Sequence, residues 1–400
     1  MAADGCAPPL RGAAPAGPRA RSTLRRRPPV EDARGAKRVA SGLSVWVARM
    51  EVRDLRNVRE ATLELAPGLN VLVGRNAQGK TSLLEAVGLL ARGRSFRTEQ
   101  IETLIRRGAG GLRALGTAVA PDRRTCLEVE VAPGTRRLAV DGREVPPREY
   151  HGRLEVVVYS TDRLRVVRGP MRERRQFLDR AGAALWPAYR QTVREFERVL
   201  AQRNAALEGG AKDLETWNER FVEVGARLRE RRAAYVDRLR QALRHGFHPE
   251  GERYDVVLVP APLEGGAAAE RPRLVAEMEG RRRDESRARR SLVGPQRDEV
   301  LLLVDGEEAG VTASSGQARS LLLALALATL EVYRQETSTA AVALLDDLDS
   351  ELDEGRATEL CREVGSRGQA LVTTAHTGWA RGLSGIGRLF QVEAGEVRAA

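Results

Sequence analysis

The sequence contains little cysteine, with only Cys6, Cys126 and Cys361 among 400 residues. These three are far apart and form neither a CxxC pair nor a Cys/His ligand pattern, so the sequence indicates no disulfide framework and no structural zinc site. Such sparse cysteine fits a reducing cytosol. His245 and His248 are close enough in the sequence to share a metal ion, but no third ligand is evident nearby, which favours two ordinary histidines.

Long apolar runs are also missing. No apolar stretch approaches the roughly 18 residues needed to cross a bilayer, because charges or glycines interrupt the longest candidates. This argues against a membrane transporter subunit. The N-terminal segment also lacks the apolar core of a secretory signal. The sequence therefore predicts a cytoplasmic protein that does not enter a membrane.

The positive charge is unevenly distributed along the chain. A net charge of +11 favours polyanionic partners, but residues 1–44 carry +6 of it. This segment is rich in Ala, Arg, Pro and Gly and has no periodic apolar pattern, so we expect a disordered basic extension. A start codon assigned too far upstream would explain the segment equally well. The other 356 residues carry only +5, so a nucleic-acid site there requires local clusters.

Hydrophobic periodicity divides the rest of the chain into three parts. Residues 45–155 contain short alternating runs typical of strands and antiparallel hairpins, and residues 156–290 have mainly helical spacing. Residues 291–400 return to apolar strands around an apolar helix. We predict an α/β fold, an ABC-type P-loop ATPase head with a mixed sheet and helices, into which the helical lobe of residues 156–290 is inserted.

The predicted helical lobe is short. It contains two helices of about 30 residues, at 172–207 and 214–243, each about 45 Å long at 1.5 Å per residue. A strand at 254–260 and a very basic polar helix follow. Further strands are predicted at 300–304, 341–345 and 370–373, and the apolar helix at 321–330.

A glycine-rich loop follows the apolar run Leu69–Val73 and precedes a helical pattern. The loop matches G-x-x-x-x-G-K-[ST], whose glycines let backbone N–H groups and a helix N-terminus face a phosphate. Lys80 would reach the β- and γ-phosphates, and Thr81 a Mg²⁺ ion. An ordinary glycine turn before a helix with a surface lysine is the alternative. The predicted nucleotide-binding residues are Gly74, Arg75, Asn76, Ala77, Gln78, Gly79, Lys80 and Thr81.

A second acidic pattern has the form of a Walker B element. The apolar strand at 341–345 ends in Asp346 and Asp347. Asp346 would hold Mg²⁺, and Asp347 stands where a second acid orients the attacking water. A strand that simply ends in an acidic turn is the alternative, but the upstream P-loop makes it less favoured.

A third pattern, Ser314-Ser315-Gly316-Gln317, precedes the apolar helix and forms another anion-binding helix start. It lies more than 230 residues after the P-loop. In ABC ATPases, the serine-glycine signature of one subunit covers the γ-phosphate held by the P-loop of the other. The order P-loop, helical insertion, signature, Walker B and D-loop is present here, and Ser314, Gly316 and Gln317 are the candidate signature contacts.

Over residues 45–395 the chain resembles the RecF family of SMC-like ABC ATPases. The resemblance rests on the motifs above and on further ordered blocks, namely Leu55-Arg56-Asn57, Arg94-Ser95-Phe96-Arg97-Thr98, residues 160–162, residues 174–179, residues 294–298 and Ser350-Glu351-Leu352-Asp353. The chain departs from the family pattern at Asn57, Arg75, Gln296 and Ala318. His376 would be a sensor of the γ-phosphate near the end of the last predicted strand.

The resemblance implies an ATP-dependent DNA-binding protein of the nucleoid. Such a protein forms a homodimer around two ATP molecules with Mg²⁺, binds duplex DNA near single-strand gaps, and works with RecR and RecO to load RecA in repair and replication restart. Weak, DNA-stimulated ATP hydrolysis would act as a release switch, with Lys80 and Asp347 as the catalytic residues. Arginines near 172–175 and 281–290 are the predicted DNA contacts, although the second cluster is equally explained as a solvated helix face.

Other functions remain as alternatives. Another SMC-like ABC ATPase of DNA maintenance would share these motifs. A small-molecule P-loop kinase would not need the serine-glycine signature. A chromosome-tethering SMC protein would need a long heptad arm, and a fused nuclease would need an acidic metal-binding segment after Asp353; the sequence contains neither.

Overall fold

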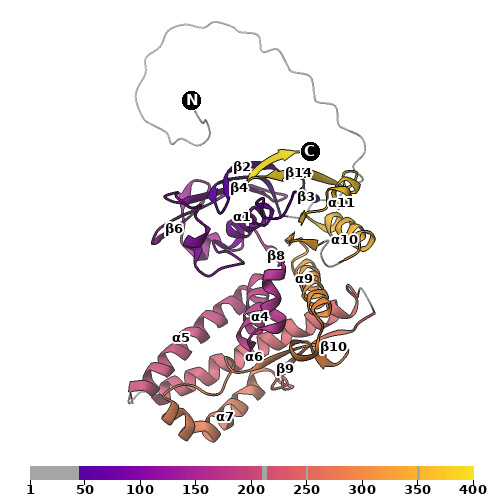
Figure 1. Ribbon diagram of the computed structural model, residues 1–400. Helices are drawn as coiled ribbons and strands as arrows, with labels where there is room; N and C mark the ends of the chain where they lie inside the picture. Colours follow the sequence, from indigo (N-terminus) through magenta and orange to yellow (C-terminus); the bar gives the residue numbers. More distant parts are fainter. Residues whose placement is uncertain (1–44, 210–213, 249–250, 349–351) are drawn as a thin grey trace, which may run out of the picture.

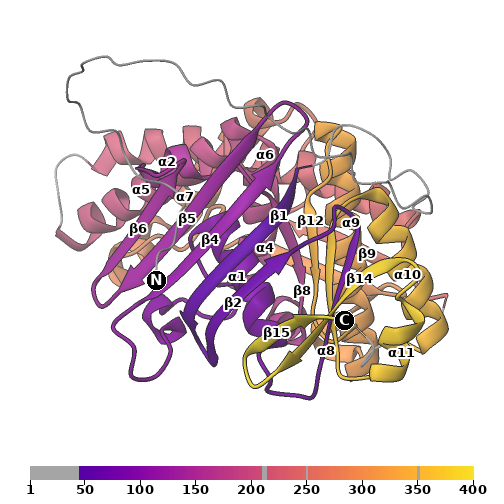
Figure 2. The ribbon, with the colours of Figure 1, turned by 90° about the horizontal axis from the view of Figure 1, so that it is seen from above.

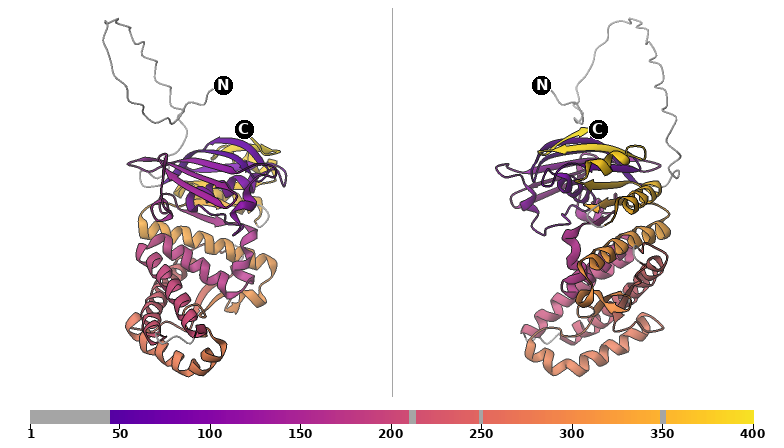
Figure 3. Two further views of the ribbon diagram at one scale, coloured as in Figure 1. Left: turned by 90° about the vertical axis from the view of Figure 1, so that its left-hand side faces the viewer. Right: turned by 45° about the vertical axis from the view of Figure 1, so that its right-hand side comes forward.

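The computed structural model describes residues 45–209, 214–248, 251–348 and 352–400. The expected basic extension, residues 1–44, and Ser350 and Glu351 of the expected D-loop lie outside this part of the chain. A head of two sheets stands above a lobe of long helices (Figures 1 and 3). Among the described residues, no helix is both long and apolar enough to cross a membrane.

The first sheet is antiparallel and has the strand order β2-β1-β4-β5-β6-β7. Its strands alternate between buried apolar and exposed polar residues, so one face packs into the head and the other faces solvent. This confirms the predicted hairpins. The strands are β1 (Trp46–Leu55), β2 (Val58–Glu64), β4 (Leu112–Val119), β5 (Arg124–Ala132), β6 (Thr135–Val140) and β7 (Arg143–Glu144), and the short helices η1 (Ile101–Leu104) and α2 (Pro147–Tyr150) lie at its ends.

The second sheet has the order β15-β14-β3-β13-β12-β8 and is parallel except at β15. Its central strands are buried along their whole length, as expected for a parallel sheet covered on both faces. The carboxyl ends of its five parallel strands therefore meet at one edge. The strands are β3 (Leu69–Val73), β8 (Val156–Tyr159), β12 (Val342–Leu345), β13 (Ala370–Thr374), β14 (Gly387–Glu393) and β15 (Glu396–Ala399).

Successive residues of this parallel sheet face two different cores. Leu72 and Leu344 pack with α1 (Lys80–Arg92) and the antiparallel sheet. Val71 and Leu345 pack with α9 (Ser315–Thr337) and α10 (Glu354–Arg367) on the other face. Helix α1 thus lies between the two sheets (Figure 2), and the loop before it lies at the edge where the parallel strands end. Helix α11 (Thr377–Gly382) completes the head.

The helical lobe differs from the prediction in its first long helix. The sequence predicts one helix over 172–207, but the structure has α4 (Met171–Leu185) and α5 (Pro187–Gly209). Proline cannot donate the backbone hydrogen bond that a continuous helix requires, and it disfavours the helical conformation of the preceding residue. Trp186 is accordingly extended, and Pro187 starts α5. The other helices here are η2 (Thr161–Leu164), α3 (Arg165–Arg168), α6 (Leu214–Arg244) and α7 (Ala267–Ala288).

A small third sheet was also not foreseen. The strand at 300–304 was expected with the strands that return to the head, but β10 (Glu299–Val304) instead pairs with β9 (Tyr254–Val259) and β11 (Glu307–Glu308). The short helix α8 (Ala309–Thr312) then leads to α9. Register between distant strands depends on tertiary packing, which an apolar run of six residues does not specify.

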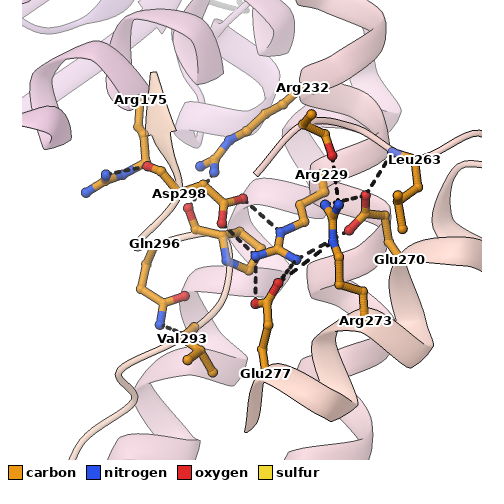
Figure 4. Close-up of polar contacts among 12 residues, drawn as sticks. Arg175, Arg229, Arg232, Leu263, Glu270, Arg273, Glu277, Val293, Gln296 and Asp298 are labelled. Atoms are coloured by element: carbon orange, nitrogen blue, oxygen red, sulfur yellow. Dashed lines mark hydrogen bonds and ion pairs between the residues drawn. The ribbon is translucent and has the colours of Figure 1, made fainter. Parts of the chain in front are cut away.

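A buried charge network holds the helical lobe together (Figure 4). Arg229 of α6 forms ion pairs with Asp298 at 2.7 Å, Glu277 of α7 at 2.9 Å and Glu270 of α7 at 3.3 Å. Burial lowers the pKa of Arg229, but the hydrogen bonds with Asp298 and Glu277 outweigh it and raise the pKa above its ordinary value. Nearby, Arg232 pairs with Asp179 of α4 at 2.8 Å. The network therefore links α4, α6, α7 and the segment before β10.

Replacing Arg229 with Met should destabilise the protein strongly, because it removes the cation that pairs with the buried Asp298 and one of the two cations that pair with the buried Glu270. The expected loss in the free energy of unfolding is about 3–5 kcal/mol. The matched control is Arg281→Met, since Arg281 pairs with Asp284 on an exposed surface and should contribute less than about 1 kcal/mol. Thermal unfolding followed by circular dichroism measures both. Equal melting temperatures for the two variants would contradict a structural role for the network.

Candidate functional site

The P-loop joins β3 to α1 and is tightly packed on its outer side. A side chain at Gly74 would collide with the backbone carbonyl of Val392 on β14, and one at Gly79 would press on Asn57 and Val58. Gly79 also has φ of 111°, in the left-handed region that favours glycine. Asn57 donates to the carbonyl of Ala77 at 3.0 Å. The glycines of the motif are therefore required by the path of the chain itself.

Gln78 fixes this loop to the turn between β14 and β15. Its side-chain Oε1 accepts a hydrogen bond from the N–H of Ala394 at 2.6 Å, and its carbonyl accepts one from the N–H of Gly395 at 2.9 Å. Its side-chain oxygen is thus engaged by the protein itself. Arg75 and Asn76 are exposed, and Asn76 lines the cavity described next.

Lys80 points into the concave side of the loop. Its Nζ donates to the carbonyls of Gly74 at 2.7 Å and Arg75 at 3.1 Å, and only 4% of the residue is exposed. Beside it lies an open cavity of about 530 Å³, and the residues lining this cavity include Asn57, Asn76, Ala77, Gly79, Lys80, Thr81 and Asp347. A cation at the mouth of a helix N-terminus makes this cavity suited to a phosphate chain. Sequence reasoning placed these residues together, and the structure does so.

Asp346 lies at the end of β12 and gathers hydroxyl groups from three other segments. Its carboxylate accepts hydrogen bonds from Thr81 of α1 at 2.9 Å, from Thr373 of β13 at 2.8 Å and from Ser160 after β8 at 3.2 Å. Among the described residues, no Lys, Arg or His forms an ion pair with it. The P-loop threonine and the Walker B aspartate are therefore in direct contact although 265 residues separate them.

The electrostatics of Asp346 fit a divalent cation. Burial raises the pKa of this carboxyl, the hydrogen bond from Thr373 opposes the rise, and the neighbouring Asp347 adds to it. A buried carboxylate without a cationic partner is a costly arrangement. Thr81 and Asp346 supply the hard oxygen ligands that Mg²⁺ prefers, and Mg²⁺ is usually held by one or two protein ligands together with substrate phosphates. The donor set therefore fits the predicted Mg²⁺.

Asp347 is held at the edge of the cavity. Its backbone has φ of 49°, and its N–H donates to the Thr373 hydroxyl at 2.8 Å. Thr373 therefore positions both acids of the Walker B pair. The sequence analysis did not identify Thr373 as a site residue, although its place near the end of a predicted strand could have indicated that it lies at this edge of the sheet. His376 is exposed at the start of α11, where its N–H donates to Thr374 at 2.9 Å, and its sensor role stays a prediction.

The signature residues lie elsewhere in the same subunit. Ser314 and Gln317 form a capping box at the start of α9, with Gln317 N–H donating to Ser314 Oγ at 3.1 Å and Ser314 N–H donating to Gln317 Oε1 at 2.9 Å. Neither they nor Gly316 lines the P-loop cavity. Within one chain, the structure does not bring the two anion-binding helix starts together.

Two ion pairs lie beside the cavity. Their arginines belong to sequence blocks to which the sequence analysis assigned no role. Arg56 pairs with the fully buried Glu85 of α1 at 2.9 Å, and Ser95 donates to the same carboxylate. Arg97 pairs with Asp162 at 2.5 Å. Both arginines line the cavity, but each is paired with a carboxylate, so their charge is balanced within the chain.

One of the predicted DNA contacts has an internal role instead. Arg174 is buried, donates to the carbonyls of Val167 at 2.8 Å and Val300 at 3.1 Å, and pairs with Glu308 at 2.8 Å. Its guanidinium is thus committed to joining α4 to β10. The arginines at 281–290 are exposed, and their contact with DNA remains a prediction.

Comparison with known proteins agrees with this geometry. The family model of the RecF/RecN/SMC N-terminal domain matches residues 46–398. The DNA replication and repair protein RecF of Symbiobacterium thermophilum is 36% identical over 367 residues, which cover 88% of this chain and 98% of that protein. RecF of Myxococcus xanthus is 35% identical, covering 82% of this chain and 90% of that protein.

Solved structures give the same result. A structure of the recombination mediator protein RecF with ATP, in the RecFOR pathway, is 25% identical, covers 91% of this chain and 100% of that chain, and superposes with a TM-score of 0.81. The SMC head domain of Pyrococcus furiosus is 15% identical, with a TM-score of 0.56 over 89% of this chain and 96% of that chain, and shows the shared fold alone.

Replacing Lys80 with Met should weaken ATP binding about 100-fold, because two charge-assisted hydrogen bonds to phosphate are worth about 3 kcal/mol together. Lys80→Arg should also bind poorly, since a planar guanidinium does not fit the place of a compact ammonium. Titration with a fluorescent ATP analogue measures both variants, and circular dichroism controls for folding. A folded Lys80→Met protein that binds the analogue as tightly as the parent would exclude this loop as the nucleotide site.

Proposed function

Since the chain belongs to the RecF family, we propose that it is an ATP-dependent DNA-binding mediator of recombination and repair. It binds duplex DNA near single-strand gaps and acts in the cytoplasm with RecR and RecO to load RecA. The contact of Thr81 with Asp346, beside the Lys80 cavity, is the observation that carries the proposal.

The positions of the site residues support one role for each. Lys80 and the N-terminus of α1 would attract the phosphates, Thr81 and Asp346 would hold Mg²⁺, and Asp347 would orient a water molecule. Bound Mg·ATP supplies a γ-phosphate charge that hydrolysis removes. Thr373 keeps both acids in place through its hydroxyl group.

Gly316 supports a composite site between two subunits. Gly316 is the second residue of α9, and glycine is a poorer helix former than alanine. A side chain here would approach only Ser314 Oγ, at 3.8 Å, so packing within this subunit does not require glycine. Glycine would be required if a group from outside the subunit approached this position closely. We infer that this group is the nucleotide held by a partner's P-loop, and that ATP therefore drives dimerisation.

The dimer face has one further feature. Val311 of α8 is 81% exposed, an unusual position for a large apolar side chain, and it lies three residues before the signature serine. Burial of this side chain in the dimer would add to the contacts that ATP provides. Loss of the γ-phosphate would then weaken the dimer and release DNA, so that weak, DNA-stimulated hydrolysis serves as a switch.

Fluorescence anisotropy with a labelled gapped duplex tests the proposed function. We expect tight binding with Mg·ATP and weak binding without nucleotide, and the Lys80→Met variant should behave as the nucleotide-free protein. Equal affinity in the presence and absence of ATP would contradict an ATP-dependent mediator.

Replacing Asp347 with Asn should slow ATP hydrolysis at least about 100-fold, because an amide cannot accept the proton of an attacking water. ATP binding should persist, and the dimer should remain longer on DNA. Asp346→Asn is the contrasting variant, since it removes the Mg²⁺ ligand and should weaken Mg·ATP binding itself. Phosphate release and ATP binding are measured for both. Normal turnover in Asp347→Asn would remove Asp347 from catalysis.

Replacing Ser314 with Arg should block dimerisation while ATP binding stays normal, because the P-loop of the same subunit is unchanged. An equal mixture of Ser314→Arg and Lys80→Ala proteins should recover part of the ATPase activity, since one whole site forms from the P-loop of the first and the signature of the second. Sedimentation and phosphate release follow the two properties. If the mixture stays inactive while unmodified subunits exchange freely, the composite site is wrong.

A further inference from the structure

Six arginines gather where the head meets the helical lobe. They come from the end of α1 and the residues after it, from β6, and from α4 and α5, and we call them the arginine surface: Arg92, Arg94, Arg136, Arg180, Arg190 and Arg194. β6 and α5 lie on the same side of the molecule in two perpendicular views (Figures 1 and 2), and Figure 2 shows α2 beside them. Four of the six, Arg94, Arg136, Arg180 and Arg194, are exposed.

Contacts and electrostatics show that these side chains are neighbours. Arg136 of β6 donates to the carbonyl of Gly93 at 2.9 Å, which places it beside Arg94. Arg92 and Arg180 line one small cavity between the head and α4. Burial and the repulsion of Arg190, Arg194, Arg94 and Arg136 lower the pKa of His151 to about 4, so four of the arginines surround one imidazole after α2.

The arginine surface is not neutralised by the protein. Over the described ranges, none of its six members forms an ion pair with a carboxylate, whereas many other arginines do, and Arg229 alone meets three. The acids nearest to it are few. Glu99 and Glu173 act on Arg180, and Glu155, whose pKa is raised by burial, interacts with Arg92 and Arg190.

Gathering like charges in a partly buried place opposes folding. Burial lowers the pKa of Arg136 and of Arg180, and nearby arginines lower both further. In the helical lobe, by contrast, the buried Arg203 is balanced by Glu285 and the buried Arg229 by Asp298. An external polyanion would balance this one, and guanidinium groups match the oxygens of phosphate in a two-pronged geometry.

We propose that the arginine surface binds the phosphate backbone of the DNA, with contacts from the head and from the helical lobe on the same duplex. This inference rests on the proposed function and specifies where the DNA lies. The charge is spread over four elements, which suits a chain of phosphates better than a single small anion. The arginines of α7 then form a solvated face.

The surface is also connected to the nucleotide site. Helix α1 starts at Lys80 and ends at Arg92, and Arg94 follows its C-cap Gly93. Its 13 residues span about 20 Å. DNA bound at one end of this helix and ATP at the other would share a single rigid element.

The test compares two double variants that remove equal charge. Arg94→Gln with Arg194→Gln removes two exposed arginines of the surface, and Arg282→Gln with Arg283→Gln removes two exposed arginines of α7. Binding of a gapped duplex with Mg·ATP is measured from 50 to 200 mM salt. ATP binding and thermal unfolding are measured for both proteins. ATP binding should not change in either, because no P-loop residue is altered, and the first double variant should be at least as stable as the parent, because it removes like charges from one cluster.

We expect the first double variant to bind DNA at least about tenfold more weakly, and the slope of log affinity against log salt to fall by about two, since each lost phosphate contact removes about 0.9. The α7 variant should stay within about threefold of the parent. A larger or equal loss in the α7 variant overturns the assignment while DNA binding itself stands. If the parent fails to bind DNA with ATP, the proposed function and this inference both fall.

Discussion

The site depends on one buried carboxylate. Asp346, which follows β12, accepts hydrogen bonds from Thr81 at the start of α1, Thr373 of β13 and Ser160 after β8. These contacts require that β3, β13, β12 and β8 be parallel and in register, because only then do their carboxyl ends meet at one edge. The whole parallel sheet, covered on both faces, thus serves to bring one threonine to one aspartate across 265 residues of sequence.

The choice of basic residue shows how specialised the P-loop is. The 66 basic residues of the chain include only three lysines, at positions 37, 80 and 212, so Lys80 is the single lysine in the described part of the chain. Arginine serves the ion pairs of the helical lobe, where its planar fork meets two or three carboxylates. The P-loop requires a compact charge that fits between two backbone carbonyls, and there the chain keeps lysine.

Much of the site could be predicted because its motifs are local. Three short motifs each contain residue types that indicate their chemical role: the P-loop, the strand end at Asp346 and the helix cap at Ser314. Thr373, Ser160 and the pair Arg56–Glu85 could not be assigned roles, since strand register alone brings them to the site. The break at Pro187 could have been read from the sequence, whereas the pairing of β10 with β9 depends on packing. Apolar periodicity specifies which face a strand buries but not its neighbour.

Two features of the single subunit have no explanation within it. A side chain at Gly316 would approach only Ser314 Oγ, and among the described residues no member of the arginine surface forms an ion pair with a carboxylate. Both features lower the stability of the isolated chain, and natural sequences retain such locally unfavourable features mainly at functional sites. A nucleotide presented by a second subunit would explain the glycine, and a DNA backbone would balance the arginines. Because α1 runs from Lys80 to the arginine surface, a shift of the P-loop on nucleotide binding would reach the DNA contacts through one packed helix.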